Sequence, residues 1–263
     1  MSKGRFTIPT DESFVEGTKI IAEKWGADAV RDCDGTKLPE NPGQFGKVYN
    51  TYFVVRGDNE WARKHPEEAQ RIFLLSNRNL ATNGTLEIKI MKGFLKDEFD
   101  PDYAYIDLWE VYDRTTGIKH EKWGYNSING IVTIENAIPF HEYTVTFLAR
   151  VTWHPVQIYN YLTNEWTCEK QLTYDPAFPA TKKYIVEHMK KWCEENPETS
   201  VVRFTTFLYQ FTLIFNNLGK ERQVEWFGYA QTANPVLMEE FEKEREIHLF
   251  AEDFVDSGYY NNC

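Results

Sequence analysis

The sequence predicts an α/β protein: the N-terminal part of a (β/α)8 barrel of the TIM type, with a small antiparallel β insertion. Helical and strand patterns alternate along most of the chain, which favours a parallel sheet. Charged residues follow directly after short apolar strands, and barrels house their sites at that end of a strand. Between residues 83 and 143 the pattern changes to period-two alternation, which is typical of antiparallel strands.

The first helix is expected between Thr10 and Gly26. Phe14, Ile21 and Trp25 recur there at helical spacing, and glycine is the usual residue just past a helix end. A short apolar strand over residues 27–30 follows. It ends on the charged residues Arg31, Asp32 and Asp34.

The segment 32–46 predicts a long irregular loop because it holds three glycines and two prolines, and such loops are usually functional. A strand is expected over residues 48–55, a polar helix over 59–70 and a strand over 71–75.

The expected insertion covers residues 83–143. Residues 85–90 and 107–112 alternate with period two, and Asn129-Gly130 is a strong hairpin signal between two further short strands. A long strand is expected over residues 142–153.

The last part of the chain predicts a helix over residues 181–195 and a strand over 201–205 that carries Arg203. A final helix is expected over residues 234–245, with Asn234 as its cap and Pro235 at its first position. About half of the strands of an eight-stranded barrel are found in this way. We therefore expect residues 1–263 to be the N-terminal part of a longer barrel domain.

The composition of the chain restricts the classes of partner and site that the protein can have. The formal net charge of -11 argues against nucleic acid and anionic membrane as partners, because both need a basic face. No apolar signal-peptide region or bilayer-spanning run is found. The four cysteines are scattered, which is typical of free thiols in a reducing compartment, so a cytoplasmic location is expected. No metal-ligand spacing and no glycine-rich phosphate motif is found either.

The best candidates for ligand binding are Arg31 and Arg203, since a guanidinium at a strand end can bind phosphate or sugar hydroxyls. Structural salt bridges to the neighbouring aspartates are an equally good reading. Asp32 and Asp34 would suit an acid/base pair for glycosyl transfer, but aspartate also favours turns, and a supporting role is preferred. Asn160 offers an amide to a sugar hydroxyl, against the alternative of a plain helix cap.

The sequence also resembles a known family. Residues 4–10, 25–36, 141–149, 175–183, 201–212 and 225–229 are similar to galacto-N-biose/lacto-N-biose phosphorylases, and the similarity runs from the first residues to the last. The resemblance implies an inverting phosphorylase that cleaves a β-1,3-galactosyl-N-acetylhexosamine with inorganic phosphate. The products would be α-galactose 1-phosphate and free N-acetylhexosamine. Phosphate is then a substrate, and no cofactor is expected.

Carried over by this resemblance, three residues line the sugar and phosphate pocket and three lie beside the acceptor sugar. The first group is Arg31, Asn160 and Arg203, and the second is Pro155, Val156 and Tyr229. Tyr229 stands where some members have a smaller residue. Its ring should narrow the acceptor site in favour of N-acetylgalactosamine.

The resemblance places the general-acid aspartate beyond residue 263, so this chain alone is expected to be inactive. Three alternatives stay open: a β-1,4-galactosyl-L-rhamnose phosphorylase of the same family, a β-galactoside hydrolase of related fold, and a sugar-binding module. The expected partners are a galactosyl disaccharide and phosphate, with a homodimer left open.

Overall fold

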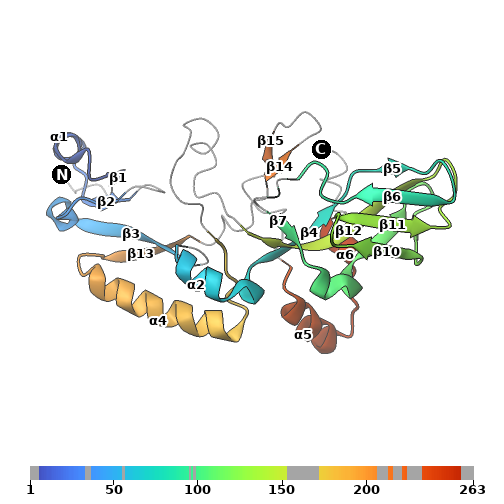
Figure 1. Ribbon diagram of the computed structural model, residues 1–263. Helices are drawn as coiled ribbons and strands as arrows, with labels where there is room; N and C mark the ends of the chain where they lie inside the picture. Colours follow the sequence, from blue (N-terminus) through green and yellow to red (C-terminus); the bar gives the residue numbers. More distant parts are fainter. Residues whose placement is uncertain are drawn as a thin grey trace.

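The computed structural model describes residues 6–32, 37–54, 57–94, 96, 99–152, 172–205, 213–215, 221–223 and 233–255. A parallel sheet lies at one end of the molecule, and a group of antiparallel strands lies at the other (Figure 1). Helices α2 (Asn59–Lys64) and α4 (Pro179–Glu195) lie beside the parallel sheet. The elements are thus divided between two bodies.

The parallel sheet has the strand order β1-β2-β3-β13, and every neighbouring pair in it is parallel. Helix α1 (Val15–Trp25) connects the first two strands, as in a barrel. Among the described residues the sheet does not close on itself. Its strands are β1 (Thr7–Pro9), β2 (Ala29–Arg31), β3 (Lys47–Phe53) and β13 (Val201–Thr205).

One face of this sheet is apolar and is covered by helices. Val30 and Val48 pack in a buried cluster with residues of α1, and Tyr52 packs with Ile185 of α4. Because side chains alternate along a strand, Arg31, Thr51 and Arg203 belong to the opposite face. Sheet alternation therefore separates the arginines from the helix-covered core.

The antiparallel strands form a six-stranded sheet centred on β12 and a three-stranded sheet in the order β10-β11-β6. They run from Arg71 to Val151, so the segment 83–143 lies inside a longer antiparallel stretch; the domain division itself stays a prediction. The strands are β4 (Arg71–Leu75), β5 (Asn79–Leu80), β6 (Thr85–Lys89), β7 (Phe99–Pro101), β8 (Glu110–Asp113), β9 (Ile118–Lys119), β10 (Trp123–Asn126), β11 (Ile131–Glu135) and β12 (Glu142–Val151).

The largest buried cluster belongs to this antiparallel body and includes Trp109, Phe147 and Leu148. Helices α5 (Pro235–Arg245) and α6 (Ala251–Val255) add Met238 and Val255 to the same cluster. The C-terminal helices therefore pack on the antiparallel strands. The remaining short elements are the 3-10 turns η1 (Pro42–Phe45), η2 (Pro66–Glu68) and η3 (Tyr103–Leu108) and the paired strands β14 (Leu213–Phe215) and β15 (Glu221–Gln223).

Two local predictions are confirmed. The side-chain oxygen of Asn234 accepts hydrogen bonds from the backbone N–H groups of Val236 and Leu237, at 2.9 and 3.2 Å, so Asn234 caps α5. The Asn129-Gly130 turn joins the antiparallel strands β10 and β11. No helix in the described ranges is both long enough and apolar enough to cross a bilayer.

Two other local predictions are wrong. The expected helix over residues 59–70 ends at Lys64 and is followed by a 3-10 turn, because Pro66 has no N–H to continue the helix. The strand expected over residues 107–112 begins only at Glu110, since residues 103–108 form the turn η3.

Candidate functional site

Arg31 and Arg203 meet at the carboxyl-terminal end of the parallel sheet. Arg31 is the last residue of β2, and Arg203 lies in β13, on the other side of β3. Nη1 of Arg31 donates a hydrogen bond to the carbonyl oxygen of Asp32 at 3.0 Å, and Nη1 of Arg203 donates to the same oxygen at 3.3 Å. Two guanidinium groups from strands far apart in the sequence therefore converge on one atom.

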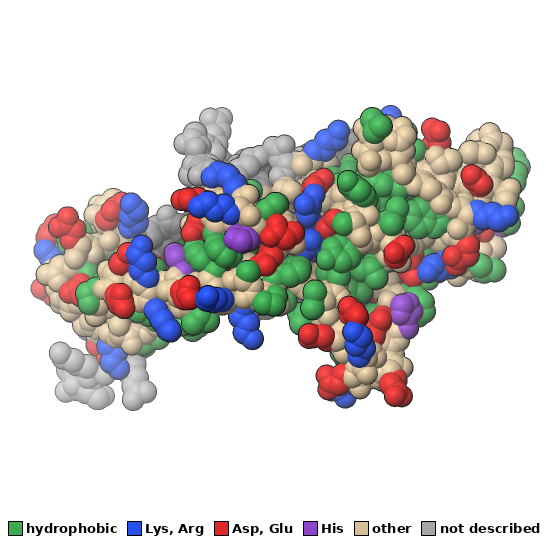
Figure 2. Space-filling model, turned by 60° about the horizontal axis from the view of Figure 1, so that its bottom comes forward, with side chains coloured by type: hydrophobic (Ala, Val, Ile, Leu, Met, Phe, Trp, Pro, Cys, Tyr) green, Lys and Arg blue, Asp and Glu red, His purple; other side chains and the backbone are tan. Residues whose placement is uncertain are grey.

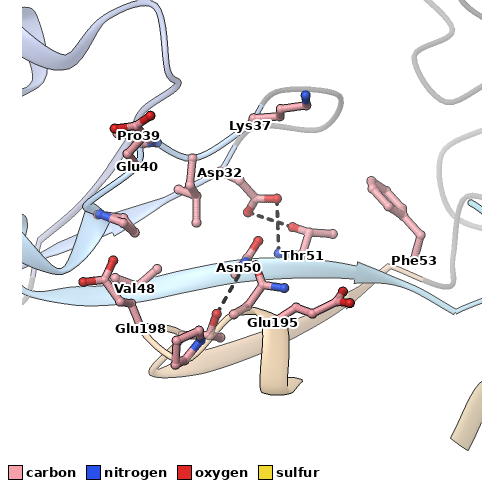
Figure 3. Close-up of a pocket in the computed structure, with 15 residues that line it drawn as sticks. Asp32, Lys37, Pro39, Glu40, Val48, Asn50, Thr51, Phe53, Glu195 and Glu198 are labelled. Carbon is pink, nitrogen blue, oxygen red and sulfur yellow. Dashed lines mark hydrogen bonds between the residues drawn. The ribbon is translucent and has the colours of Figure 1, made fainter. Parts of the chain in front are cut away.

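The side chain of Asp32 is held in place by the neighbouring strand. Asp32 is 5% exposed. Its Oδ2 accepts a hydrogen bond from the backbone N–H of Thr51 at 3.1 Å, and its Oδ1 accepts from the Thr51 hydroxyl at 2.8 Å (Figure 3). Oδ1 also lies 3.4 Å from Nη1 of Arg203. Strands β2, β3 and β13 are thus joined at this one carboxylate.

This arrangement suits an anion with several oxygen atoms. A guanidinium presents five donors in a planar fork, and both side chains are only partly buried, so donors remain for a ligand. The surrounding protein is acidic, and on the face shown in Figure 2 Lys and Arg side chains are interspersed with Asp and Glu. The overall charge would repel an anion, and the local pair of arginines is the group at this site that would attract one.

A cavity of about 580 Å³ lies beside this cluster and is bordered by Asp32 and Thr51 (Figure 3). Its lining also includes three glutamates, Glu40, Glu195 and Glu198, and one positively charged side chain, Lys37. The excess of carboxylates disfavours phosphate in this cavity. Arg31 and Arg203 are not among the residues that line it.

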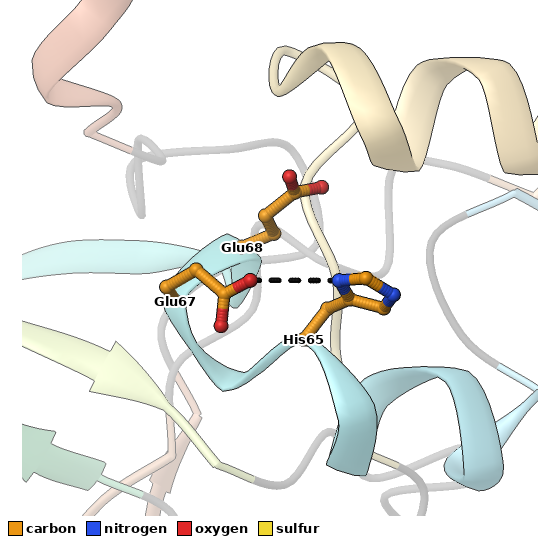
Figure 4. A group of neighbouring side chains, drawn as sticks. All are labelled: His65, Glu67 and Glu68. Atoms are coloured by element: carbon orange, nitrogen blue, oxygen red, sulfur yellow. Dashed lines mark ion pairs between the residues drawn. The ribbon is translucent and has the colours of Figure 1, made fainter.

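A possible metal-binding group that the sequence analysis did not identify is formed by His65, Glu67 and Glu68, one ligand atom of each lying within 4.8 Å of the others (Figure 4). These residues already have structural contacts. The Glu68 carboxylate accepts the Thr181 backbone N–H at 2.7 Å, and the His65 ring stacks on Trp61 with centroids 3.9 Å apart. Glu68 thus caps a helix and His65 stacks on a ring, so both residues have structural roles without a metal. The absence of a metal stays a prediction.

A second polar group lies between α2 and α4. The Tyr184 hydroxyl donates to the Asp58 carboxylate, and Tyr184 stacks face to face on Trp61 with centroids 4.1 Å apart. Burial by itself would raise the pKa of Asp58, but the hydrogen bonds from Tyr184 and the Trp61 backbone outweigh it and lower that pKa. This group fastens the two helices and lies apart from the arginines.

Four other predicted site residues and Asp34 lie outside the described residues; the four are Pro155, Val156, Asn160 and Tyr229. Of the predicted binding residues, the structure thus brings together Arg31 and Arg203. Sequence reasoning missed Thr51. The only available signal was a threonine among the apolar and aromatic residues of a predicted strand.

Comparison with known proteins decides the family. A family model described as the lacto-N-biose phosphorylase N-terminal TIM barrel domain matches residues 4–263. The chain belongs to the lacto-N-biose phosphorylase family. The family resemblance and the barrel fold class, both predicted from the sequence, are confirmed. The parallel sheet is the part of that barrel seen in the described residues.

Several members of this family are similar over nearly the whole chain. A 1,3-beta-galactosyl-N-acetylhexosamine phosphorylase of Lachnoclostridium phytofermentans is 46% identical over 98% of the chain, and one of Bifidobacterium longum is 43% identical over 100%. A D-galactosyl-beta-1->4-L-rhamnose phosphorylase of L. phytofermentans is 35% identical over 99%. The chain spans 36 to 37% of the length of these relatives.

Proposed function

We propose that this chain is part of an inverting phosphorylase acting on β-1,3-galactosyl-N-acetylhexosamines, and that Arg31 and Arg203 hold the attacking phosphate. The observation that carries the proposal is their convergence on the Asp32 carbonyl oxygen. The family and the names of the relatives supply the reaction class.

In the proposed reaction a phosphate oxygen attacks the anomeric carbon of galactose from the face opposite the leaving group. The products are α-galactose 1-phosphate and free N-acetylhexosamine. Phosphate replaces the water of an inverting hydrolase, so no carboxylate base is needed and one general acid suffices. The arginines would hold the phosphate in line with the breaking bond. No cofactor is proposed.

Asp32 is a poor candidate for the general acid, because its carboxylate is buried and accepts two hydrogen bonds from Thr51. We expect the acid outside residues 1–263, as the resemblance implies. This chain alone should then bind phosphate without turning over a disaccharide. Release of galactose 1-phosphate by the purified chain would contradict that expectation.

The acceptor is proposed to be an N-acetylhexosamine. Relatives named for that acceptor are 42 to 46% identical to the chain, compared with 35% for the rhamnose enzyme. Asn160 is proposed to bind the sugar, and Pro155, Val156 and Tyr229 to border the acceptor. If Tyr229 favours N-acetylgalactosamine, Tyr229→Cys should reduce that preference in an acceptor screen of the full-length enzyme. An unchanged acceptor preference in Tyr229→Cys would contradict the proposed role of Tyr229.

Phosphate binding is the direct test of the arginine site. Isothermal titration of the chain with inorganic phosphate should give saturable binding that Arg31→Ala and Arg203→Ala each weaken by about tenfold or more. The matched control is Arg78→Ala, because Arg78 is exposed and pairs with Glu142 on the antiparallel body. Equal phosphate affinity in all four proteins would refute the site.

Two other function classes give different results. A hydrolase would release galactose without phosphate, because it activates water with a second carboxylate. A sugar-binding module would bind galactosides, and Arg31→Ala would change its phosphate affinity little. A cytoplasmic location is also proposed, and it rests on the four scattered cysteines.

A further inference from the structure

We propose that Asp32 is a positioning residue that fixes the two phosphate-binding arginines relative to each other. The inference rests on the proposed function, because it concerns the same anion site. Asp32 would act through Arg31 and Arg203 and would not touch the phosphate, since its own negative charge repels an anion.

Asp32 contacts both arginines through its carbonyl oxygen, and it also contacts Arg203 through its carboxylate. Its carbonyl oxygen accepts from Arg31 at 3.0 Å and from Arg203 at 3.3 Å, and its Oδ1 lies 3.4 Å from Nη1 of Arg203. Long flexible side chains lose conformational freedom when they bind a ligand. A group that orders both guanidinium groups beforehand lowers that cost and strengthens phosphate binding.

The neighbouring strand β3 holds the Asp32 side chain in place. Both carboxylate oxygens accept hydrogen bonds from Thr51, one from the backbone and one from the hydroxyl. Thr51 lies in β3 and is directly paired with Arg203 of β13 in the parallel register, while β3 also pairs with β2. The sheet register therefore fixes Asp32, whose carbonyl oxygen contacts both arginines and whose carboxylate contacts Arg203.

The test compares Asp32→Asn with Thr51→Val. Asp32→Asn keeps the shape and one acceptor oxygen but removes the charge that faces Arg203. It should weaken phosphate binding about tenfold in isothermal titration of the full chain. Thr51→Val removes one hydrogen bond to Asp32 and keeps the backbone bond, so a smaller loss, of about threefold, is expected.

A second readout separates positioning from general stability. Side-chain NMR of the Arg203 Nε–H group should show greater mobility in Asp32→Asn, while urea unfolding stays cooperative. The matched control is Asp102→Asn, which breaks the buried ion pair with Arg71 (2.8 Å) in the antiparallel body. Asp102→Asn should lower the urea midpoint and leave phosphate affinity unchanged.

The outcomes distinguish this inference from the proposed function. If the arginine variants lose phosphate affinity but Asp32→Asn binds phosphate like the wild type, the positioning role is wrong and the phosphate site stands. If the wild type binds no phosphate, both fail. If Asp32→Asn does not fold, Thr51→Val decides: wild-type affinity together with unchanged Arg203 mobility would overturn the positioning role.

Discussion

At the scale of single residues, Tyr52 shows how burial changes the pKa of a side chain. Tyr52 is almost completely buried between β3 and α4, and its hydroxyl lies 2.9 Å from Nδ1 of His188. Burial, with a smaller contribution from Cys193, raises the pKa of Tyr52 to about 12. The folded protein therefore keeps this phenol protonated at a pH where the unfolded chain, with an ordinary tyrosine pKa of about 10, loses the proton.

The sign of the pH effect follows from this difference. Between about pH 10 and 12 the unfolded state binds fewer protons than the folded state, so the stabilising contribution of Tyr52 is lost as the pH rises. We expect the urea midpoint to fall more steeply over this range in the wild type than in Tyr52→Phe. Tyr103→Phe is the control because Tyr103 is exposed. Parallel pH curves for wild type and Tyr52→Phe would contradict the prediction.

The Arg31–Asp32–Arg203 group shows what the sequence could reveal at this scale. Each arginine was recognisable, because each is a charged residue in or directly after a short apolar strand. Their meeting at Asp32 was not, because it depends on the register of β3 with β2 and β13, and Arg203 lies 171 residues away from Asp32. Local patterns hold no information on such long-range pairing.

At the scale of elements, the start of helix α4 depends on a distant carboxylate. Glu68 accepts the backbone N–H of Thr181 in the first turn of α4, and Phe178, at the cap position, makes no such side-chain bond. Glu68→Ala should destabilise the fold by about 1 kcal/mol, as loss of a cap does. Glu68→Gln keeps an acceptor and should lose less. Glu67→Ala, which removes an exposed carboxylate, is the control in urea unfolding. Equal loss from Glu67→Ala would argue against the cap.

Helix α6 is fastened to the antiparallel body by a partly buried ion pair. Arg114 donates to both carboxylate oxygens of Glu252, at 2.8 and 2.7 Å, and the side chains are 16% and 13% exposed. Glu252→Ala should cost about 2 kcal/mol, because it leaves the arginine charge without its carboxylate partner.

The matched control for Glu252→Ala is Glu239→Ala, which breaks an exposed pair with Lys243 on α5. Solvent screens exposed helix pairs, so this variant should unfold almost like the wild type. Chemical unfolding followed by tryptophan fluorescence compares the two. A similar loss in both variants would show that burial of the Arg114–Glu252 pair adds nothing.

Helices and strands are predicted correctly where a local sequence motif fixes their ends. They are predicted wrongly where a proline or a turn interrupts the sequence pattern. The cap of α5 and the β10–β11 hairpin follow from Asn234 and Asn129-Gly130. The helix expected over 59–70 is broken because Pro66 outweighs the polar helical pattern. The pairing of β12 with four other strands could not be predicted from local sequence patterns, because it joins segments spread from Arg71 to Val151.

At the scale of the whole molecule, the proposed phosphate site and the largest hydrophobic core lie in different bodies. The arginines belong to the parallel sheet, while Trp109, Phe147 and Leu148 lie in the antiparallel body. Ligand binding stabilises the folded state it binds, by about 2.7 kcal/mol at a free concentration of 100 times Kd. Different parts of a structure open with different free energies, so phosphate binding can stabilise the parallel sheet without stabilising the antiparallel body.

We therefore expect phosphate to slow amide hydrogen exchange in β2, β3 and β13 and to leave β4, β8 and β12 unchanged. Sodium chloride at equal ionic strength is the control, because screening of the net charge of -11 would act on both bodies. Arg203→Ala should remove the phosphate effect and keep the chloride effect. Equal protection of both bodies by phosphate, retained in Arg203→Ala, would mean that phosphate acts on the whole acidic surface and not at the paired arginines.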